Sequence, residues 1–125
     1  MRMKLVLIAL GGALGAVSRF VLSSLIQSNN SSDFPFGTFS VNILGCLFIG
    51  IVWASLSSQE QNLWTPFVMT GILGGFTTFS TFGLESIQLW QTGKITTLVA
   101  YVLLSNIVGL LAVLFGSKLY ESLVK

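Results

Sequence analysis

The sequence contains no histidine and only one cysteine, Cys46, among its 125 residues. A lone thiol excludes an internal disulfide and any zinc site built from several cysteines. The absence of histidine removes both the commonest metal ligand and the commonest general base. Because no nucleophile and base can be paired in the usual way, we expect that the chain is not an enzyme.

Charged residues are also scarce, at 8% of the chain, whereas soluble domains carry about 25%. Apolar residues make up 53%, and the mean hydropathy is +0.86. The net charge of +2 is small and the basic residues are scattered, which argues against nucleic-acid binding. The composition indicates an integral membrane protein whose solvent is the lipid bilayer.

Four segments are long and apolar enough to cross a bilayer as helices, which takes about 20 residues each. They cover approximately residues 4–27, 37–56, 63–89 and 95–119, with short polar connectors between them, including 57–62. Arg2 and Lys4 at the start of the chain resemble the basic region of a signal peptide, but the apolar stretch continues to about Ile26, which favours a retained helix. The sequence therefore predicts one all-α domain over residues 1–125 with four transmembrane helices.

An even number of spans places both termini on the same side of the membrane. That side carries Arg2, Lys4, Lys118 and Lys125, and the other side carries Lys94, with Arg19 near the membrane edge. The bias favours termini inside the cell. It rests on few charges, so insertion in both directions is a second expectation.

The third span has an unusual centre, with paired glycines followed by hydroxyl and β-branched residues between Gly71 and Glu85. This composition makes a poor helix centre. A helix broken at membrane depth frees carbonyl groups that must face protein, ions or water. The alternative is a continuous helix whose small and hydroxyl residues pack against neighbours. Gly11 with Gly15, and Gly71 with Gly75, form small-xxx-small patterns that predict close helix contacts.

Two phenylalanines of this span, Phe79 and Phe82, are three residues apart and share a face in a helix. They could simply fill a core or face lipid. The functional alternative uses the positive electrostatic potential of the ring edges, against which a dehydrated small anion can lie.

Polar side chains also occur inside the second and fourth spans. Asn42 carries an NH₂ group that can donate to an anion, and Tyr101 and Ser105 are four residues apart on one helix face. They are candidates for a polar track. The alternative is ordinary hydrogen bonding between helices.

Arg19 and Glu85 are the two costly charges within the predicted spans, and such charges mark candidate functional sites. Arg19 lies near the end of its span, where it can reach the interface or attract anions to a vestibule. Glu85 is a candidate partner for Arg19 or a lining group of a water-filled mouth.

Three segments together resemble the Fluc (CrcB) family of fluoride ion channels. They are residues 11–20 in the first span, 35–42 at the start of the second, and 74–82 in the third. The number of spans and the Tyr101/Ser105 spacing agree with the resemblance. Phe76, where many relatives carry leucine, and Asn106, which varies in the family, are small departures.

The resemblance implies an antiparallel, dual-topology dimer with a third helix broken in the middle of the membrane. It implies a fluoride path lined by Phe79 and Phe82, with Asn42 as a donor. Tyr101 and Ser105 would continue the polar track.

The resemblance also implies places for the two charges and for a cation. Glu85 would face the path near one end, and Arg19 would lie near an aqueous vestibule. A structural sodium ion at the dimer interface would be held by the backbone carbonyls of Gly74 and Thr77.

The expected function is a fluoride-selective passive channel in a bacterial inner membrane, which exports cytoplasmic fluoride and lowers its toxicity. The chain would pair with itself or with a paralogue. The alternative is a small multidrug-type, proton-coupled exporter, which needs a carboxylate in the membrane, normally in the first span. The first span has no acidic residue, so Glu85 is the sole candidate for that role.

Overall fold

The computed structural model describes residues 1–56 and 63–124. The predicted connector 57–62 lies outside the described residues, as does Lys125, one of the basic residues counted at the terminal side. The elements are α1 (Arg2–Ser28), α2 (Phe36–Leu56), η1 (Pro66–Leu73), α3 (Gly74–Phe76), α4 (Phe79–Gln91) and α5 (Ile95–Val124). Over the described residues all regular structure is helical, which confirms the all-α prediction.

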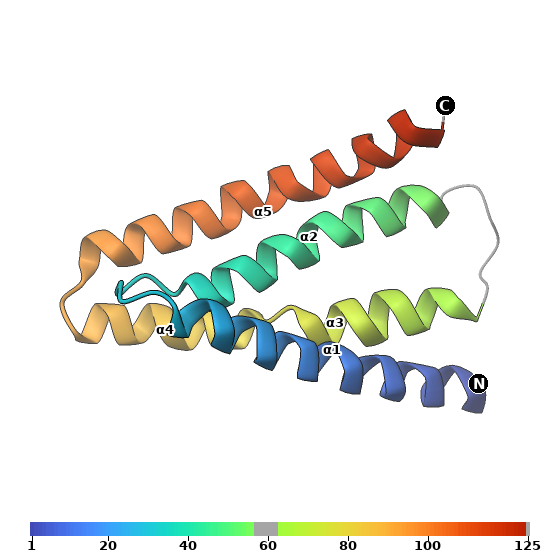
Figure 1. The fold of residues 1–125 in the computed structure, drawn as a ribbon, viewed down its shortest axis with the longest axis horizontal. Coiled ribbons are helices and arrows are strands. Elements are labelled where there is room, and N and C mark those ends of the chain that lie inside the picture. Colours follow the sequence, from blue (N-terminus) through green and yellow to red (C-terminus); the bar gives the residue numbers. More distant parts are fainter. Residues whose placement is uncertain (57–62, 125) are drawn as a thin grey trace.

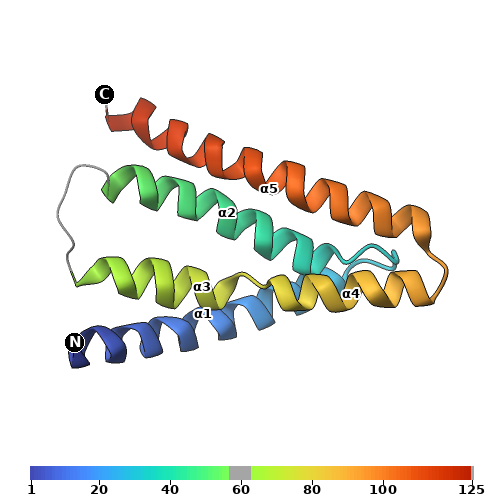
Figure 2. The same cartoon turned by 180° about the vertical axis from the view of Figure 1, so that it is seen from behind.

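Four helical stretches of the described chain are long and apolar enough to span a membrane, as predicted. They are Arg2–Ser28, Phe36–Leu56, Pro66–Gln91 and Ile95–Val124, with mean hydropathies between 1.3 and 2.5 in their most apolar windows. Successive stretches run in opposite directions along the long axis, so both termini lie at one end of the bundle (Figure 1). At the opposite end, the α1–α2 connector lies near the α4–α5 turn (Figure 2).

Close backbone contacts hold the bundle together in two pairs. A Cβ atom added at Gly15 on α1 would lie 2.1 Å from the carbonyl oxygen of Ile72 on η1, so only glycine fits there. Gly50 on α2 and Gly116 on α5 are as closely packed, since an added Cβ would meet Val113 O at 2.1 Å and Leu47 O at 2.2 Å. Small residues therefore let α1 pack against η1 and α2 pack against α5.

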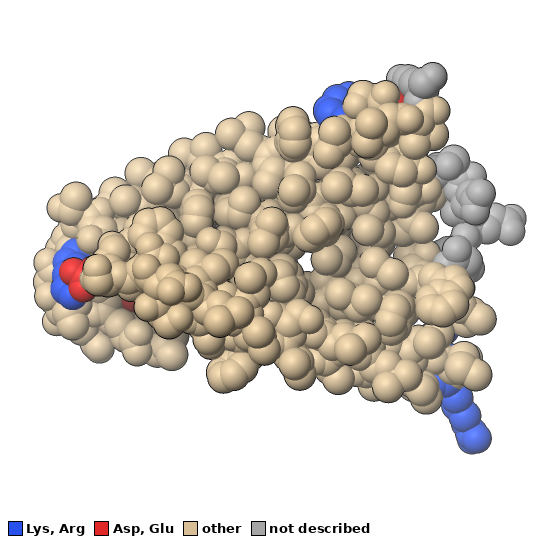
Figure 3. Space-filling model, viewed as in Figure 1, with Lys and Arg blue, Asp and Glu red and all other residues tan. Residues whose placement is uncertain are grey.

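The surface of the bundle is apolar over its middle. Leucine, valine and phenylalanine side chains are exposed along α1 and α5, among them Leu14 at 57% and Leu110 at 69%. On the face shown in Figure 3, charged atoms occur only near the two ends. An apolar band between charged ends is the surface that a bilayer requires.

The α4–α5 turn and the α1–α2 connector are joined at the end away from the termini. Gly93 adopts a φ of 74°, and the Lys94 amide donates to the Leu89 carbonyl at 2.9 Å, which ends α4 in a tight glycine-containing cap. The cap presents the Lys94 ammonium to the Asp33 carboxylate on the connector, and the two form an ion pair.

Candidate functional site

Two extended residues, Thr77 and Thr78, separate α3 from α4. Their φ and ψ angles are −86° and 157° for Thr77 and −151° and 114° for Thr78. The Thr77 amide still donates to the Leu73 carbonyl at 3.1 Å. Thr78 then acts as the N-cap of α4, because its Oγ1 accepts from the Thr81 amide at 3.1 Å.

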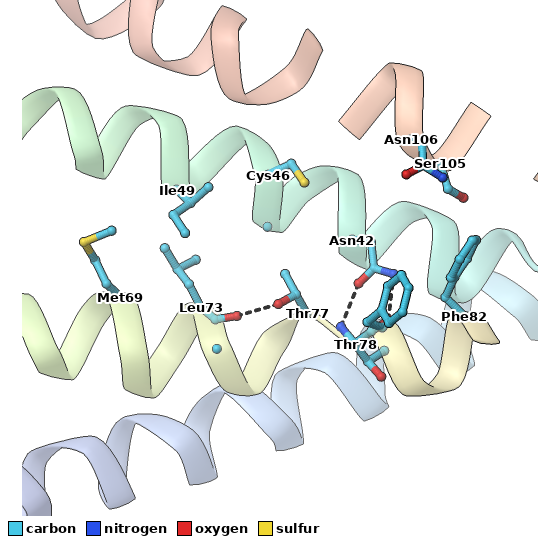
Figure 4. Close-up of a pocket in the computed structure, with 13 residues that line it drawn as sticks. Asn42, Cys46, Ile49, Met69, Leu73, Thr77, Thr78, Phe82, Ser105 and Asn106 are labelled. Atoms are coloured by element: carbon cyan, nitrogen blue, oxygen red, sulfur yellow. Dashed lines mark hydrogen bonds between the residues drawn. The ribbon is translucent and has the colours of Figure 1, made fainter. Parts of the chain in front are cut away.

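The side chain of Asn42 on α2 binds this segment in two directions. Its Nδ2 donates to the Thr78 carbonyl at 3.0 Å, and its Oδ1 accepts from the Thr78 amide at 2.8 Å. Figure 4 shows Asn42 directed at Thr78 with these bonds drawn. Asn42 therefore fixes the peptide on both sides of Thr78, and one of its two N–H donors remains for another partner.

Arg19 on α1 supports the same segment from the other side. Its Nε donates to the carbonyl oxygen of Gly75 at 3.1 Å, just before α3 ends. A cation near the C-terminal end of a helix is favourable because the helix dipole is negative there. The structure thus places Arg19 beside the end of α3.

A cavity of about 340 Å³ lies beside the extended residues. Its apolar part includes Ile49, Met69 and Leu73, while Asn42 and Thr78 lie toward the other part (Figure 4). Six residues predicted as site residues line this one cavity, namely Asn42, Gly74, Thr77, Phe79, Phe82 and Ser105. None of its lining residues is charged.

An aromatic series leads from the cavity toward the end of the bundle that carries the α4–α5 turn. The ring centroids of Phe79 and Phe82 are 5.4 Å apart, and those of Phe82 and Tyr101 are 5.0 Å apart. Tyr101 is completely buried, whereas Phe79 is 81% exposed in the single chain. The predicted pair Phe79 and Phe82 therefore does share a face, and one of its rings projects out of the bundle.

Glu85 lies beyond this series and is held by two hydroxyl groups. Thr38 Oγ1 donates to Oε1 at 2.7 Å, and the Tyr101 hydroxyl donates to Oε2 at 2.7 Å. Short bonds of this kind to a carboxylate are strong. Glu85 is therefore bonded to Thr38 and Tyr101, and no salt bridge joins it to Arg19 among the described residues.

Glu85 also lines a second, polar cavity of about 280 Å³. Gln27, Gln88 and Thr92 contribute to its walls, together with the paired Asp33 and Lys94. This cavity lies where the α1–α2 connector meets the α4–α5 turn. The carboxylate of Glu85 thus lies between this polar cavity and the aromatic series of Phe79, Phe82 and Tyr101.

Ser105 has an uncommon environment on α5. Its Oγ atom is buried and has no hydrogen-bond partner within the described part of the chain. The neighbouring Asn106 is satisfied, because its Nδ2 donates to the Val102 carbonyl at 2.8 Å. Ser105 therefore contributes an unused donor beside the cavity, and Asn106 has one donor engaged on its own helix.

The described residues contain no cluster of three or more histidine, cysteine or acidic side chains that could bind a metal. A cation at this site would have to be bound by uncharged oxygen atoms. Hard cations accept backbone carbonyls as ligands. The carbonyl-bearing residues Gly74 and Thr77 both line the cavity, so the donor type fits.

Two threonines of the site were not predicted from the sequence. Thr38 donates to Glu85, and Thr78 caps α4. Thr38 had a detectable signal, because it lies four residues before Asn42 and both polar side chains fall on one face of α2. Thr78 was visible only as part of a hydroxyl-rich run.

Comparison with known proteins places the chain in a family. Residues 6–117 match the family model of CrcB-like protein, Camphor Resistance (CrcB). A protein of Azobacteroides pseudotrichonymphae is 49% identical over 121 residues, which cover 94% of this chain and 96% of that protein. A protein of Paracoccus denitrificans is 45% identical over 109 residues, 87% of each chain.

A third relative, from Parabacteroides distasonis, is 39% identical over 122 residues, covering 97% of this chain and 95% of its own. Each of the three relatives is named fluoride-specific ion channel FluC. With four helices of membrane-spanning length and relatives of this kind over nearly its whole length, the chain is a multi-pass membrane protein. It belongs to the CrcB family.

Proposed function

We propose that two oppositely oriented chains form a passive, fluoride-selective channel that exports cytoplasmic fluoride across a bacterial inner membrane. The observation that carries the proposal is the Phe79–Phe82 pair, which lies beside two extended residues and at an uncharged cavity. The name of the relatives, fluoride-specific ion channel, supports the same function.

The lining of the cavity suits a small, strongly hydrated anion. Such an ion enters only where the pore replaces its water, as selectivity filters do. Ring edges of Phe79 and Phe82 offer positive potential, and the Ser105 hydroxyl and the remaining Asn42 N–H offer donors. Because no lysine or arginine lines the cavity, the anion is not held too tightly to leave.

The proton-coupled exporter is the weaker alternative. Such an exporter needs a carboxylate that exchanges protons with a cationic drug. No acidic residue lines the larger cavity, and both oxygens of Glu85 accept hydrogen bonds from hydroxyl groups. This arrangement favours a passive pore, in which the negative potential of the cell interior drives fluoride out.

Two chains are needed because one chain does not enclose the path. Phe79 is 81% exposed, although it lies in the middle of a membrane-spanning stretch. A second chain would cover Phe79 and close the cavity. The small charge difference between the two ends supports the antiparallel arrangement, in which each chain inserts in the opposite direction.

A structural sodium ion is part of the proposal, with the Gly74 and Thr77 carbonyls as ligands. In the antiparallel dimer, the interruption between α3 and α4 would lie in the middle of the membrane, and two copies would supply four carbonyl oxygens. Backbone carbonyls can replace the hydration shell of an alkali cation. The sodium would act as a structural ion, holding the two interruptions together.

Fluoride efflux from liposomes, read by a fluoride electrode with chloride efflux as the control, tests the proposal. Phe79→Ile and Phe82→Ile should each lower fluoride efflux about tenfold, equivalent to about 1.4 kcal/mol. Phe115→Ile is the matched control, because Phe115 lies on α5 outside the cavity lining and is 62% exposed. Equal fluoride and chloride efflux, or Phe79 and Phe82 variants that behave like the control, would contradict the channel mechanism.

A further inference from the structure

The two carbonyls assigned to the cation are the ones that lose their helical partners at the interruption. In a continuous helix, the Thr78 amide would donate to Gly74 O and the Thr81 amide would donate to Thr77 O. Here the Thr78 amide donates to Asn42 Oδ1 at 2.8 Å, and the Thr81 amide donates to Thr78 Oγ1 at 3.1 Å. Two side-chain oxygens, Asn42 Oδ1 and Thr78 Oγ1, therefore accept the hydrogen bonds of these two amides.

Neighbouring carbonyls are satisfied in other ways. Leu73 O accepts from both the amide and the hydroxyl of Thr77, at 3.1 and 3.0 Å. Gly75 O accepts from Arg19 Nε, and Thr78 O accepts from Asn42 Nδ2. Within the described part of the chain, no side chain or amide donates to Gly74 O or Thr77 O.

An unpaired carbonyl at membrane depth is costly, since lipid offers no donor. Both Gly74 and Thr77 line the 340 Å³ cavity rather than the packed interior of the bundle. The cation Arg19 hydrogen-bonds to this segment, and its Nε donates to Gly75 O rather than to the Gly74 or Thr77 carbonyl. The two residues whose carbonyls lose their helical partners thus lie at one cavity, while the carbonyls of Leu73, Gly75 and Thr78 accept other hydrogen bonds.

We infer that Asn42 and Thr78 are positioning residues for the cation, because their side chains capture the amides that would otherwise occupy the Gly74 and Thr77 carbonyls. This inference rests on the sodium site of the proposed function. It gives Asn42 a second task beside fluoride donation. It also links the two ions, because Phe79 directly follows Thr78 as the first residue of α4.

The experiment compares Thr78→Val with Thr78→Ser. Valine keeps the size of threonine and removes Oγ1, whereas serine keeps the capping oxygen. The purified protein in detergent is heated at increasing sodium chloride, with N-methylglucamine chloride holding the ionic strength constant. Wild type and Thr78→Ser should show a sodium-dependent rise in the unfolding temperature, and Thr78→Val should need about tenfold more sodium for the same rise.

A second readout follows the carbonyls themselves. The ¹³C carbonyl resonances of Gly74 and Thr77 are measured in labelled protein without sodium. Thr78→Val should move the Thr77 resonance toward helical values, and Asn42→Leu should do so for Gly74. The resonances show whether each carbonyl accepts a hydrogen bond, even where a variant is too unstable for the sodium titration.

The outcomes separate the inference from the channel. A wild-type protein that passes fluoride but shows no sodium response would overturn the inference and leave the channel standing. Variants with wild-type carbonyl resonances and wild-type sodium response would overturn it as well. A sodium response that is weakened in Thr78→Val, in a protein that passes no fluoride, would support the inference and reject the channel.

Discussion

The hydroxyl group of Tyr101 donates a 2.7 Å hydrogen bond to Glu85, and Tyr101 is completely buried. The phenol ring packs against Phe82, so a single side chain joins the carboxylate to the aromatic series. Glu85 is in turn a wall of the polar cavity at the end of the bundle. Tyr101 is therefore the direct physical link between the mouth and the proposed fluoride path.

Tyr101→Phe should lower both stability and fluoride efflux. The ring remains, but the half-buried Glu85 loses one of its two hydroxyl donors, which costs about 1 kcal/mol. Thermal unfolding and liposome efflux measure the two effects. Tyr120→Phe makes the same chemical change near the end of α5 and serves as the control. Equal behaviour of the two variants would contradict the role given to Tyr101.

Ser105→Ala should lower fluoride efflux and leave stability nearly unchanged. The Oγ atom is buried without a partner in the described chain, so its removal breaks no hydrogen bond. If the hydroxyl donates only to the passing ion, its loss should lower efflux about tenfold, equivalent to about 1.4 kcal/mol. Ser117→Ala, which removes a hydroxyl bonded to Leu114 O on the same helix, should leave efflux unchanged. A stability loss in Ser105→Ala without an efflux change would refute this assignment.

Asp33→Asn should raise fluoride efflux at low ionic strength, and Lys94→Gln should lower it. The two residues are paired at the rim of the polar cavity, where Asp33 cancels the attraction of Lys94 for anions. We expect changes of about twofold in 10 mM salt that vanish near 1 M, because exposed charges are screened there. Salt-independent changes would indicate that the pair acts through the shape of the connector instead.

Gly15→Ala should prevent normal packing of α1 against η1. The new Cβ would lie 2.1 Å from Ile72 O, which is backbone and cannot move aside without shifting a helix. A loss of about 1–3 kcal/mol or more is expected for such overpacking. Gly12→Ala is the matched control, since nothing lies within 4 Å of a Cβ added at that position. Unfolding in detergent distinguishes the two, and equal stabilities would rule out the close contact.

Hydropathy predicted the membrane-spanning stretches well because the bilayer imposes a length and a composition on them. It could not predict the helix ends. The last helix continues to Val124, beyond the expected end near Leu119, because a helix can extend into water until its sequence stops it. Nor could hydropathy predict that η1 is a π-helix. A π-helix and an α-helix differ in backbone hydrogen bonding, and hydropathy depends only on the side chains.

The composition of residues 71–85 predicted a weak helix in the segment that does contain the extended residues, but the glycines are not the cause. The glycines were expected to weaken the helix, yet Gly74 and Gly75 remain helical and the extended residues are Thr77 and Thr78. Gly75 serves close packing, since its added Cβ would lie 2.6 Å from Gly12 O. The small-xxx-small pattern was therefore the correct explanation of that glycine.

The site contacts depended on information that no local pattern holds. Asn42 is 36 residues from Thr78 in the chain, and Thr38 is 47 residues from Glu85. Such pairs depend on how far one helix is shifted along another, and that shift is a property of the packed bundle rather than of any one segment. The polar residues could be named from the sequence as candidates, but which of them would bond to each other could not.

The glycine contact between α1 and η1 also constrains how the protein is made. The two helices are separated in the chain by the whole of α2, so the surface of α1 around Gly11 and Gly15 stays without its partner during synthesis. Only when the residues from Gly71 to Gly75 have entered the membrane can the two backbones meet. The third span is thus the step of synthesis at which α1 first meets the backbone it packs against, and the α2–α5 contact can follow only after α5 is made.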